Sequence, residues 1–151
     1  MTKKADFNAE EWSQVLEGPP IAGMIVITAQ RGGTLRESIS MGKAYTEARE
    51  QHGSSELLDE IVGANPEIDT KQFGSAEELR TQGLQRLRDA VALLESKASA
   101  DEVEGYKSFV VSLAQRVAEA HKEGGVLGVG GKEVGEAEQA ALEELKEAVG
   151  A

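Results

Sequence analysis

A glycine-rich segment is the part of the sequence whose composition first suggests chemistry. Five glycines lie among the eight residues from Gly124 to Gly131, and Lys132 follows them directly. A phosphate-binding P-loop has the pattern G-x-x-x-x-G-K-[ST]. Its first glycine lies five residues before the glycine that precedes the lysine, and a Ser or Thr follows the lysine. This chain has Val126 and Glu133 at those two positions, and a dinucleotide-binding G-x-G-x-x-G would also need glycine in place of Glu133. Phosphate binding is therefore not expected here.

The apolar residues of the same segment suggest a structural role instead. Val126, Leu127 and Val129 lie between the glycines, and three apolar side chains are costly to expose to water. We expect them to fold inward over the open end of a helical hairpin. The alternative is an exposed patch that contacts a partner, which makes these three residues a candidate interaction loop.

The two histidines are poor candidates for metal ligands. A di-iron bundle uses Glu-x-x-His pairs, but Arg49 precedes His52 by three residues and Ala118 precedes His121 by three. Both histidines fall near the expected ends of helices, where a positive charge interacts favourably with the helix dipole.

One loop has some features of a calcium site. Oxygen-bearing side chains alternate at Asn65, Glu67 and Asp69. A calcium-binding loop also needs glycine at its sixth position and glutamate at its twelfth. The chain has Thr70 and Ala76 there, so calcium binding is not expected.

The sequence offers no evidence of catalysis. It contains no cysteine, which excludes thiol catalysis, disulfides and Cys-ligated metals, and it has no G-x-S-x-G nucleophile motif. We therefore predict a protein that is not an enzyme, with no catalytic, cofactor-binding or metal-binding residue and no cofactor.

Composition narrows the classes of partner. The chain has 27 acidic and 16 basic residues and a formal net charge of -11, which disfavours nucleic acid and anionic membranes. The longest apolar run, Ile21–Ile27, is too short to span a bilayer, and no signal peptide is evident. We expect a soluble, cytoplasmic protein without membrane insertion, whose partner is another protein or a second copy of the chain.

The first expected helix begins at Asn8. Asn8 and Glu11 have the spacing of a capping box, in which each side chain accepts a hydrogen bond from the backbone of the other residue. Phe7 and Trp12 have the positions of a hydrophobic staple across that helix start. The sequence Gly18–Pro19–Pro20 predicts the end of this helix and the start of a second at Pro20, since the first residue of a helix needs no N–H donor.

The apolar segment that follows is the expected centre of the fold. Residues 21–30 are apolar all round, and the β-branched side chains among them would also suit a buried strand. No other segment could pair with such a strand, so we predict a helix. Gly23 would allow another helix to approach closely, and Trp12 is expected to be buried against this segment.

The remaining elements complete an all-α fold. Capping boxes are expected at Thr34, Ser75 and Ser99, a short helix after Ser54 or Ser55, and a last helix over 135–149. Two stripes with helical spacing predict a long antiparallel hairpin over about 76–123: Leu84, Leu87, Val91, Leu94 and Ala98, then Val103, Tyr106, Val110, Leu113, Val117 and Ala120. We predict one domain over 1–151, a bundle of about six or seven helices with residues 1–7 frayed.

Two stretches resemble known proteins. The sequences FNAEEWSQVLEGPPIAGMIVITA and KEGGVLGVGGKEVGEAEQAALEEL resemble the opening and closing parts of small bacterial helical proteins. They are also similar to TerB-type domains of tellurite resistance, in which an acidic turn enters a helix. Val134 and Glu138 match that pattern, whereas Gly131 and Lys132 stand where it has its acidic residue and its glycine. The resemblance implies an all-helical fold.

These observations favour a function in binding. We expect a non-enzymatic soluble helical domain that acts through protein–protein contacts, with stress response as one setting. The alternative is an acidic metal- or small-ligand-binding module of TerB type.

Overall fold

The computed structural model of this chain is built from α-helices. It describes every residue except 1–3, 30–33, 51–55, 65–72, 125–135 and 151, and the residues that it describes include no β-strand. In chain order the elements are the 3₁₀ turn η1 (Lys4–Asp6), α1 (Ala9–Ala29), α2 (Thr34–Glu50), α3 (Glu56–Gly63), α4 (Ala76–Lys97), α5 (Ala100–Gly124) and α6 (Glu136–Val149). The expected all-α fold is confirmed.

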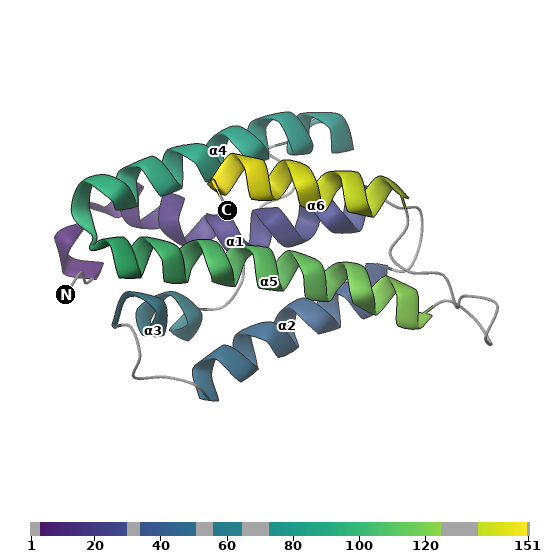
Figure 1. Cartoon of the computed structure of the whole chain (residues 1–151), viewed down its shortest axis with the longest axis horizontal. Helices are drawn as coiled ribbons and strands as arrows, with labels where there is room; N and C mark the ends of the chain where they lie inside the picture. The colour runs from purple at the N-terminus through teal and green to yellow at the C-terminus, as the bar shows by residue number, and fades with distance from the viewer. Residues whose placement is uncertain (1–3, 30–33, 51–55, 65–72, 125–135, 151) are drawn as a thin grey trace.

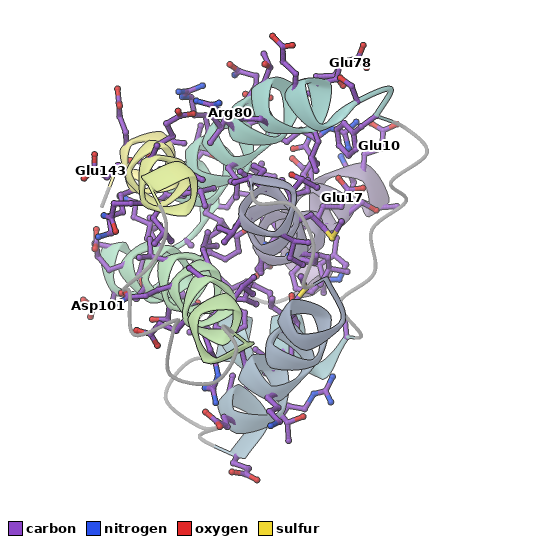
Figure 2. All side chains as sticks on the ribbon, turned by 90° about the vertical axis from the view of Figure 1, so that its right-hand side faces the viewer. Glu10, Glu17, Glu78, Arg80, Asp101 and Glu143 are labelled. Atoms are coloured by element: carbon purple, nitrogen blue, oxygen red, sulfur yellow. The ribbon has the colours of Figure 1, made fainter. Side chains whose placement is uncertain are left out.

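The helices form two layers that share α5. In Figure 1, α1, α4, α5 and α6 lie together as a bundle, while α2 and α3 lie on the other side of α5. Figure 2, which looks along the bundle, places α1 near its centre and the labelled Glu78, Asp101 and Glu143 on its outside. Helix α5 contacts every other α-helix, and α3 packs on α2 and α5. The expected single helical bundle is therefore confirmed.

The expected hairpin is made by α4 and α5, which are joined by Ala98 and Ser99 and run in opposite directions (Figure 1). Its arms are spread apart, because α1 and α6 pack against both of them. The two predicted stripes face these neighbours. Their buried members are Leu84, Leu87, Val91, Leu94, Val103, Tyr106, Val110, Leu113 and Val117.

Capping interactions begin three of the helices, and two of the predicted capping boxes are complete. Ser99 and Glu102 exchange both hydrogen bonds of a capping box, at 3.1 and 3.2 Å. Ser75 accepts a bond from the Glu78 amide, but the Glu78 carboxylate accepts from the amide of Gly74 rather than from that of Ser75. The α1 box, between Asn8 and Glu11, is also complete. The side chain of Thr34 lies outside those that the structure describes.

The predicted break at Gly18–Pro19–Pro20 is wrong. Helix α1 continues through both prolines to Ala29, and all three residues are buried. The apolar segment is therefore the second half of α1 and not a separate helix. Its central position is confirmed, since Ile21, Ala22, Ile25, Val26 and Ile27 are buried.

A hydrogen bond from α5 explains how α1 tolerates a proline. Pro19 has no N–H, so the carbonyl of Val15 loses its partner within the helix. The hydroxyl of Tyr106 donates to that carbonyl at 2.8 Å, and Tyr106 is fully buried. Gly18 makes room for the hydroxyl, because a Cβ atom there would lie 1.9 Å from the Tyr106 oxygen. A donor 91 residues away thus replaces the missing amide.

Gly23 has the role predicted for it. A Cβ atom at this position would lie 2.5 Å from the terminal carbon of Met41 on α2 and 3.1 Å from Leu113 on α5. The glycine therefore allows side chains from both neighbouring helices to pack against the backbone of α1.

The start of the chain departs from expectation in two ways. Residues 4–7 are not frayed, because Phe7 is buried and Lys97 donates to the Asp6 carbonyl at 2.9 Å. Trp12 is buried as expected, with 7% of its surface exposed. It cannot pack as predicted against a separate helix formed by residues 21–27, because those residues continue its own helix. Its ring instead contacts that of Phe7, with centroids 5.6 Å apart, as the staple predicts.

Replacing Tyr106 with Phe should show that its hydroxyl substitutes for the missing amide. We expect Tyr106→Phe to lower the free energy of unfolding by about 1–3 kcal/mol, because a buried carbonyl loses its donor. In a Pro19→Ala background the new amide at position 19 can reach Val15, so the same substitution should cost clearly less. Urea unfolding of the wild type, both single variants and the double variant measures this coupling. Equal costs in the two backgrounds would contradict the assignment.

Alkaline pH should destabilise the fold through its two tyrosines. Burial raises the pKa of Tyr45 and of Tyr106 above the ordinary 10.0. Both hydroxyls therefore stay protonated in the folded protein after those of the unfolded chain ionise, and stability falls as pH rises above about 10. Each tyrosine should contribute a slope of about 1.4 kcal/mol per pH unit. Urea unfolding between about pH 9 and pH 11 should give a shallower slope for Tyr45→Phe than for the wild type.

Candidate functional site

Several residues singled out in the sequence lie outside the described part of the chain. These are the candidate interaction loop of Val126, Leu127 and Val129, the side chains of His52 and His121, and residues 65–72 of the calcium-like loop. Helix α5 ends at Gly124, where the glycine-rich segment begins. The roles considered for these residues stay predictions.

Two general findings concern the described residues alone. No group of three or more His, Cys, Asp or Glu side chains among them is arranged to hold a metal ion. No described helix combines the length and the apolar character needed to cross a bilayer.

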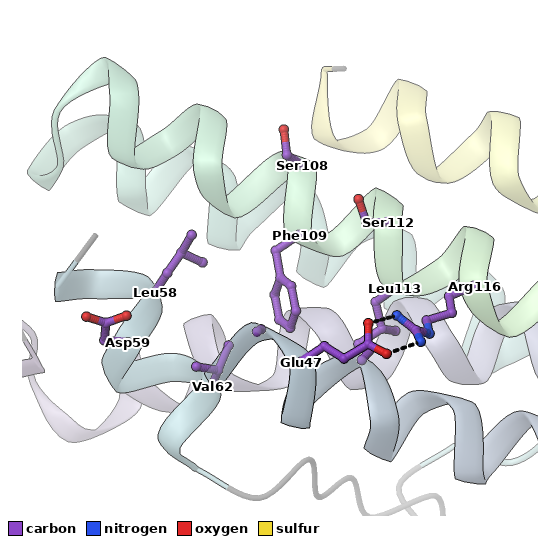
Figure 3. Close-up of a pocket in the computed structure, with 11 residues that line it drawn as sticks. Glu47, Leu58, Asp59, Val62, Ser108, Phe109, Ser112, Leu113 and Arg116 are labelled. Atoms are coloured by element: carbon purple, nitrogen blue, oxygen red, sulfur yellow. Dashed lines mark hydrogen bonds and ion pairs between the residues drawn. The ribbon is translucent and has the colours of Figure 1, made fainter. Parts of the chain in front are cut away.

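A half-open cleft lies where α2, α3 and α5 meet. Its volume is about 330 Å³, within the usual range for ligand pockets. Figure 3 shows residues from all three helices facing this space. The lining residues are Ala44, Glu47 and Ala48 of α2, Leu58, Asp59 and Val62 of α3, and Ser108, Phe109, Ser112, Leu113 and Arg116 of α5.

The floor of the cleft is apolar and held by aromatic packing. Phe109 is half-buried, and its ring meets the buried ring of Tyr45 edge-on with centroids 5.3 Å apart. Leu58 is also half-buried and approaches the backbone of α5 at Gly105, where a Cβ atom would lie 3.2 Å from its side chain. Apolar surface on both Phe109 and Leu58 is therefore still accessible from the cleft.

An ion pair between α2 and α5 forms one polar end of the cleft. Both side-chain nitrogens of the Arg116 fork donate to the carboxylate of Glu47 (Figure 3). These hydrogen bonds lower the pKa of Glu47, and the charges of Arg116 and Lys43 act in the same direction while partial burial opposes them. Glu47 therefore stays ionised at neutral pH. Asp59 marks the other end of the cleft, on α3 beside Leu58 (Figure 3).

Arg49 fixes α3 against α2. Its Nε donates to the Val62 carbonyl at 2.5 Å, and its terminal nitrogen donates to the Ala64 carbonyl at 3.3 Å. These carbonyls lie at the C-terminal end of α3, where backbone acceptors have no partner within the helix and a positive charge is favourable. An arginine on α2 thus positions the wall of the cleft that carries Leu58 and Asp59.

The polar groups of the cleft surround its apolar floor. A nucleophilic serine needs a general base within hydrogen-bonding distance. Within the described part of the chain, neither Ser108 nor Ser112 has a hydrogen bond to a carboxylate. What the cleft presents is an accessible apolar floor with hydroxyl groups along one rim and charged groups at both ends.

Sequence patterns alone do not reveal the cleft, although one of them indicates an additional contact surface on α5. Phe109 lies outside the buried stripe of α5, between Tyr106 and Val110, and an aromatic residue off the main stripe indicates a second contact surface. Ser108, Ser112 and Arg116 are spaced four residues apart and so share that helix face.

Comparison with known proteins gives no relative. No protein-family model matches the chain, and neither the curated proteins nor the solved structures contain a match. The resemblance to TerB-type domains therefore stays a prediction.

Removing the charge of Arg49 should loosen α3. We expect Arg49→Met, which keeps an unbranched apolar stem, to lower the free energy of unfolding by about 1–2 kcal/mol, because two carbonyls lose a charged donor. Amide hydrogen exchange in Glu56–Gly63 should accelerate more than in α5. Arg88→Met is the matched control, since Arg88 is exposed on α4. If both variants behave alike, Arg49 does not hold α3 in place.

Proposed function

We propose that this protein is a non-enzymatic binding domain that acts through protein–protein contacts, and that the cleft between α2, α3 and α5 is its contact site. The observation that carries this proposal is the half-open cleft of about 330 Å³ with accessible apolar surface on Leu58 and Phe109. Apolar anchors that enter a pocket supply most of the binding energy in protein interfaces.

The openness of the cleft favours a protein partner over a small molecule. A ligand site usually buries most of its ligand, whereas this cleft leaves one side exposed to solvent. An extended or helical segment of a partner would cover that side while placing an apolar side chain on the floor. A stress-related setting for this contact stays a prediction.

Blocking the cleft tests the proposed function. Ser112 is exposed and lines the cleft, so Ser112→Trp should place an indole over the opening without disturbing the core. The matched control is Ser13→Trp, because Ser13 is exposed on α1 and does not line the cleft. Proteins that the wild type captures from a cell extract would be purified and their affinity for each variant measured.

We expect Ser112→Trp to weaken the association at least tenfold, because it fills the space that the apolar anchor needs, and Ser13→Trp to leave it unchanged. Sedimentation of the protein alone shows whether the captured partner is a second copy of the chain. Equal affinity of the wild type and Ser112→Trp for every partner would exclude the cleft as the contact site.

A further inference from the structure

We propose that the partner segment that enters the α2–α3–α5 cleft is cationic and amphipathic. One of its Lys or Arg side chains replaces Arg116 as the ion-pair partner of Glu47. This inference rests on the proposed function, because it assigns a chemical class to the partner at the same cleft.

The apolar half of this segment is set by the floor of the cleft. An apolar cavity of about 150 Å³ is enough to bind benzene, and the cleft has about 330 Å³. Phe109 is held by its edge-on contact with Tyr45, so the floor is formed before anything binds. The cleft therefore has room for an aromatic or branched aliphatic anchor with part of the backbone that carries it.

The positive charge of the proposed segment follows from the charges of the chain. The charged residues that line the cleft are Glu47, Asp59 and Arg116, and the guanidinium of Arg49 is held by carbonyls at the end of α3. The whole chain has a net charge of -11, and such a field raises the local concentration of cations and their rate of association. Lys43 also lies near Glu47, but it is exposed and is not part of the cleft lining. An anionic segment would have to enter against this field and displace Glu47 from its partner.

The ion pair at the end of the cleft is suited to exchange. The side chains of Arg116 and Glu47 are 38% and 50% exposed, and exposed ion pairs contribute little to stability. Glu47 keeps its negative charge when Arg116 moves away, because its half-exposed carboxylate is ionised at neutral pH. An incoming ammonium or guanidinium group would then donate hydrogen bonds to the carboxylate that Arg116 now contacts.

The test uses two labelled peptides of about 18 residues, or five helical turns. One is an amphipathic helix of Leu and Lys, and the other is its twin with Glu in place of Lys. Fluorescence anisotropy gives the Kd of each peptide for the full chain and its variants at an ionic strength of about 0.15 M. Thermal melting confirms that each variant is folded.

Two single substitutions should have opposite effects on binding of the Lys peptide. Glu47→Gln should weaken binding about two- to fivefold, because it removes the carboxylate that the peptide uses. Arg116→Gln should tighten binding by a similar factor, because it frees Glu47 and removes a competing cation. The Glu peptide should bind more weakly than the Lys peptide to the wild type.

The chain contains a matched control pair. Arg80 on α4 also donates two hydrogen bonds to one carboxylate, that of Glu144 on α6, and this pair lies outside the cleft. Arg80→Gln and Glu144→Gln make the same changes in net charge as the cleft variants. They should alter the Kd of the Lys peptide by less than a factor of about 1.5, since salt screens charges beyond about 8 Å.

Three outcomes would overturn the inference. Weaker binding with both Glu47→Gln and Arg116→Gln would mean that the pair only holds α2 against α5. Tighter binding of the Glu peptide would assign the cleft to an anionic segment. Equal effects of Glu144→Gln and Glu47→Gln would mean that the peptide responds to net charge alone.

Ser112→Trp separates this inference from the proposed function. If it abolishes peptide binding while the charge variants contradict expectation, the cleft is the contact site and its occupant has a different chemistry. If it leaves binding of both peptides unchanged, the cleft is not the site and both proposals fail. Self-association of the chain that is lost in Ser112→Trp would identify a second copy as the occupant instead of a cationic segment.

Discussion

The buried carbonyl of Val15 is the constraint on which the arrangement of the helices depends. Pro19 removes the amide that would bond to it, and an unsatisfied carbonyl in the interior costs as much as a lost hydrogen bond. The hydroxyl of Tyr106 on α5 supplies the donor that this group lacks within its own helix. The bond fixes the position of α5 along α1, and it requires glycine at position 18 because the hydroxyl occupies the space of a side chain there.

The position of α5 in turn sets the geometry of the cleft. One face of α5 carries Tyr106 toward α1, and an adjacent face carries Phe109 toward α2. The cleft lies on this second face, and α3 closes it because Arg49 holds the end of that helix. The cleft thus results from the packing of α2 and α3 on the bundle formed by the other helices.

Local patterns in the sequence predicted the fold well, and long-range contacts account for what they missed. The capping box at Ser99 and the apolar stripes of α4 and α5 are short-range signals, so residue spacing was enough to place those helices. The break predicted at Pro19 was wrong because the group that rescues the helix lies 91 residues away. Likewise, Glu47 and Arg116 are separated by 69 residues, and no spacing rule could bring them together.

Helix α5 belongs to both layers, and this has a thermodynamic consequence. Binding at the cleft is linked to the stability of the whole fold, because only the folded chain contains the cleft. A molecule that binds only the folded cleft stabilises the whole bundle by mass action, including the distant contact between α1 and α5. Conversely, a substitution at Gly18 or Tyr106 that unfolds part of the population lowers the apparent affinity of the proposed contact site in proportion, because only folded chains bind. A loss of stability in the bundle core would then be measured at the cleft as weaker binding.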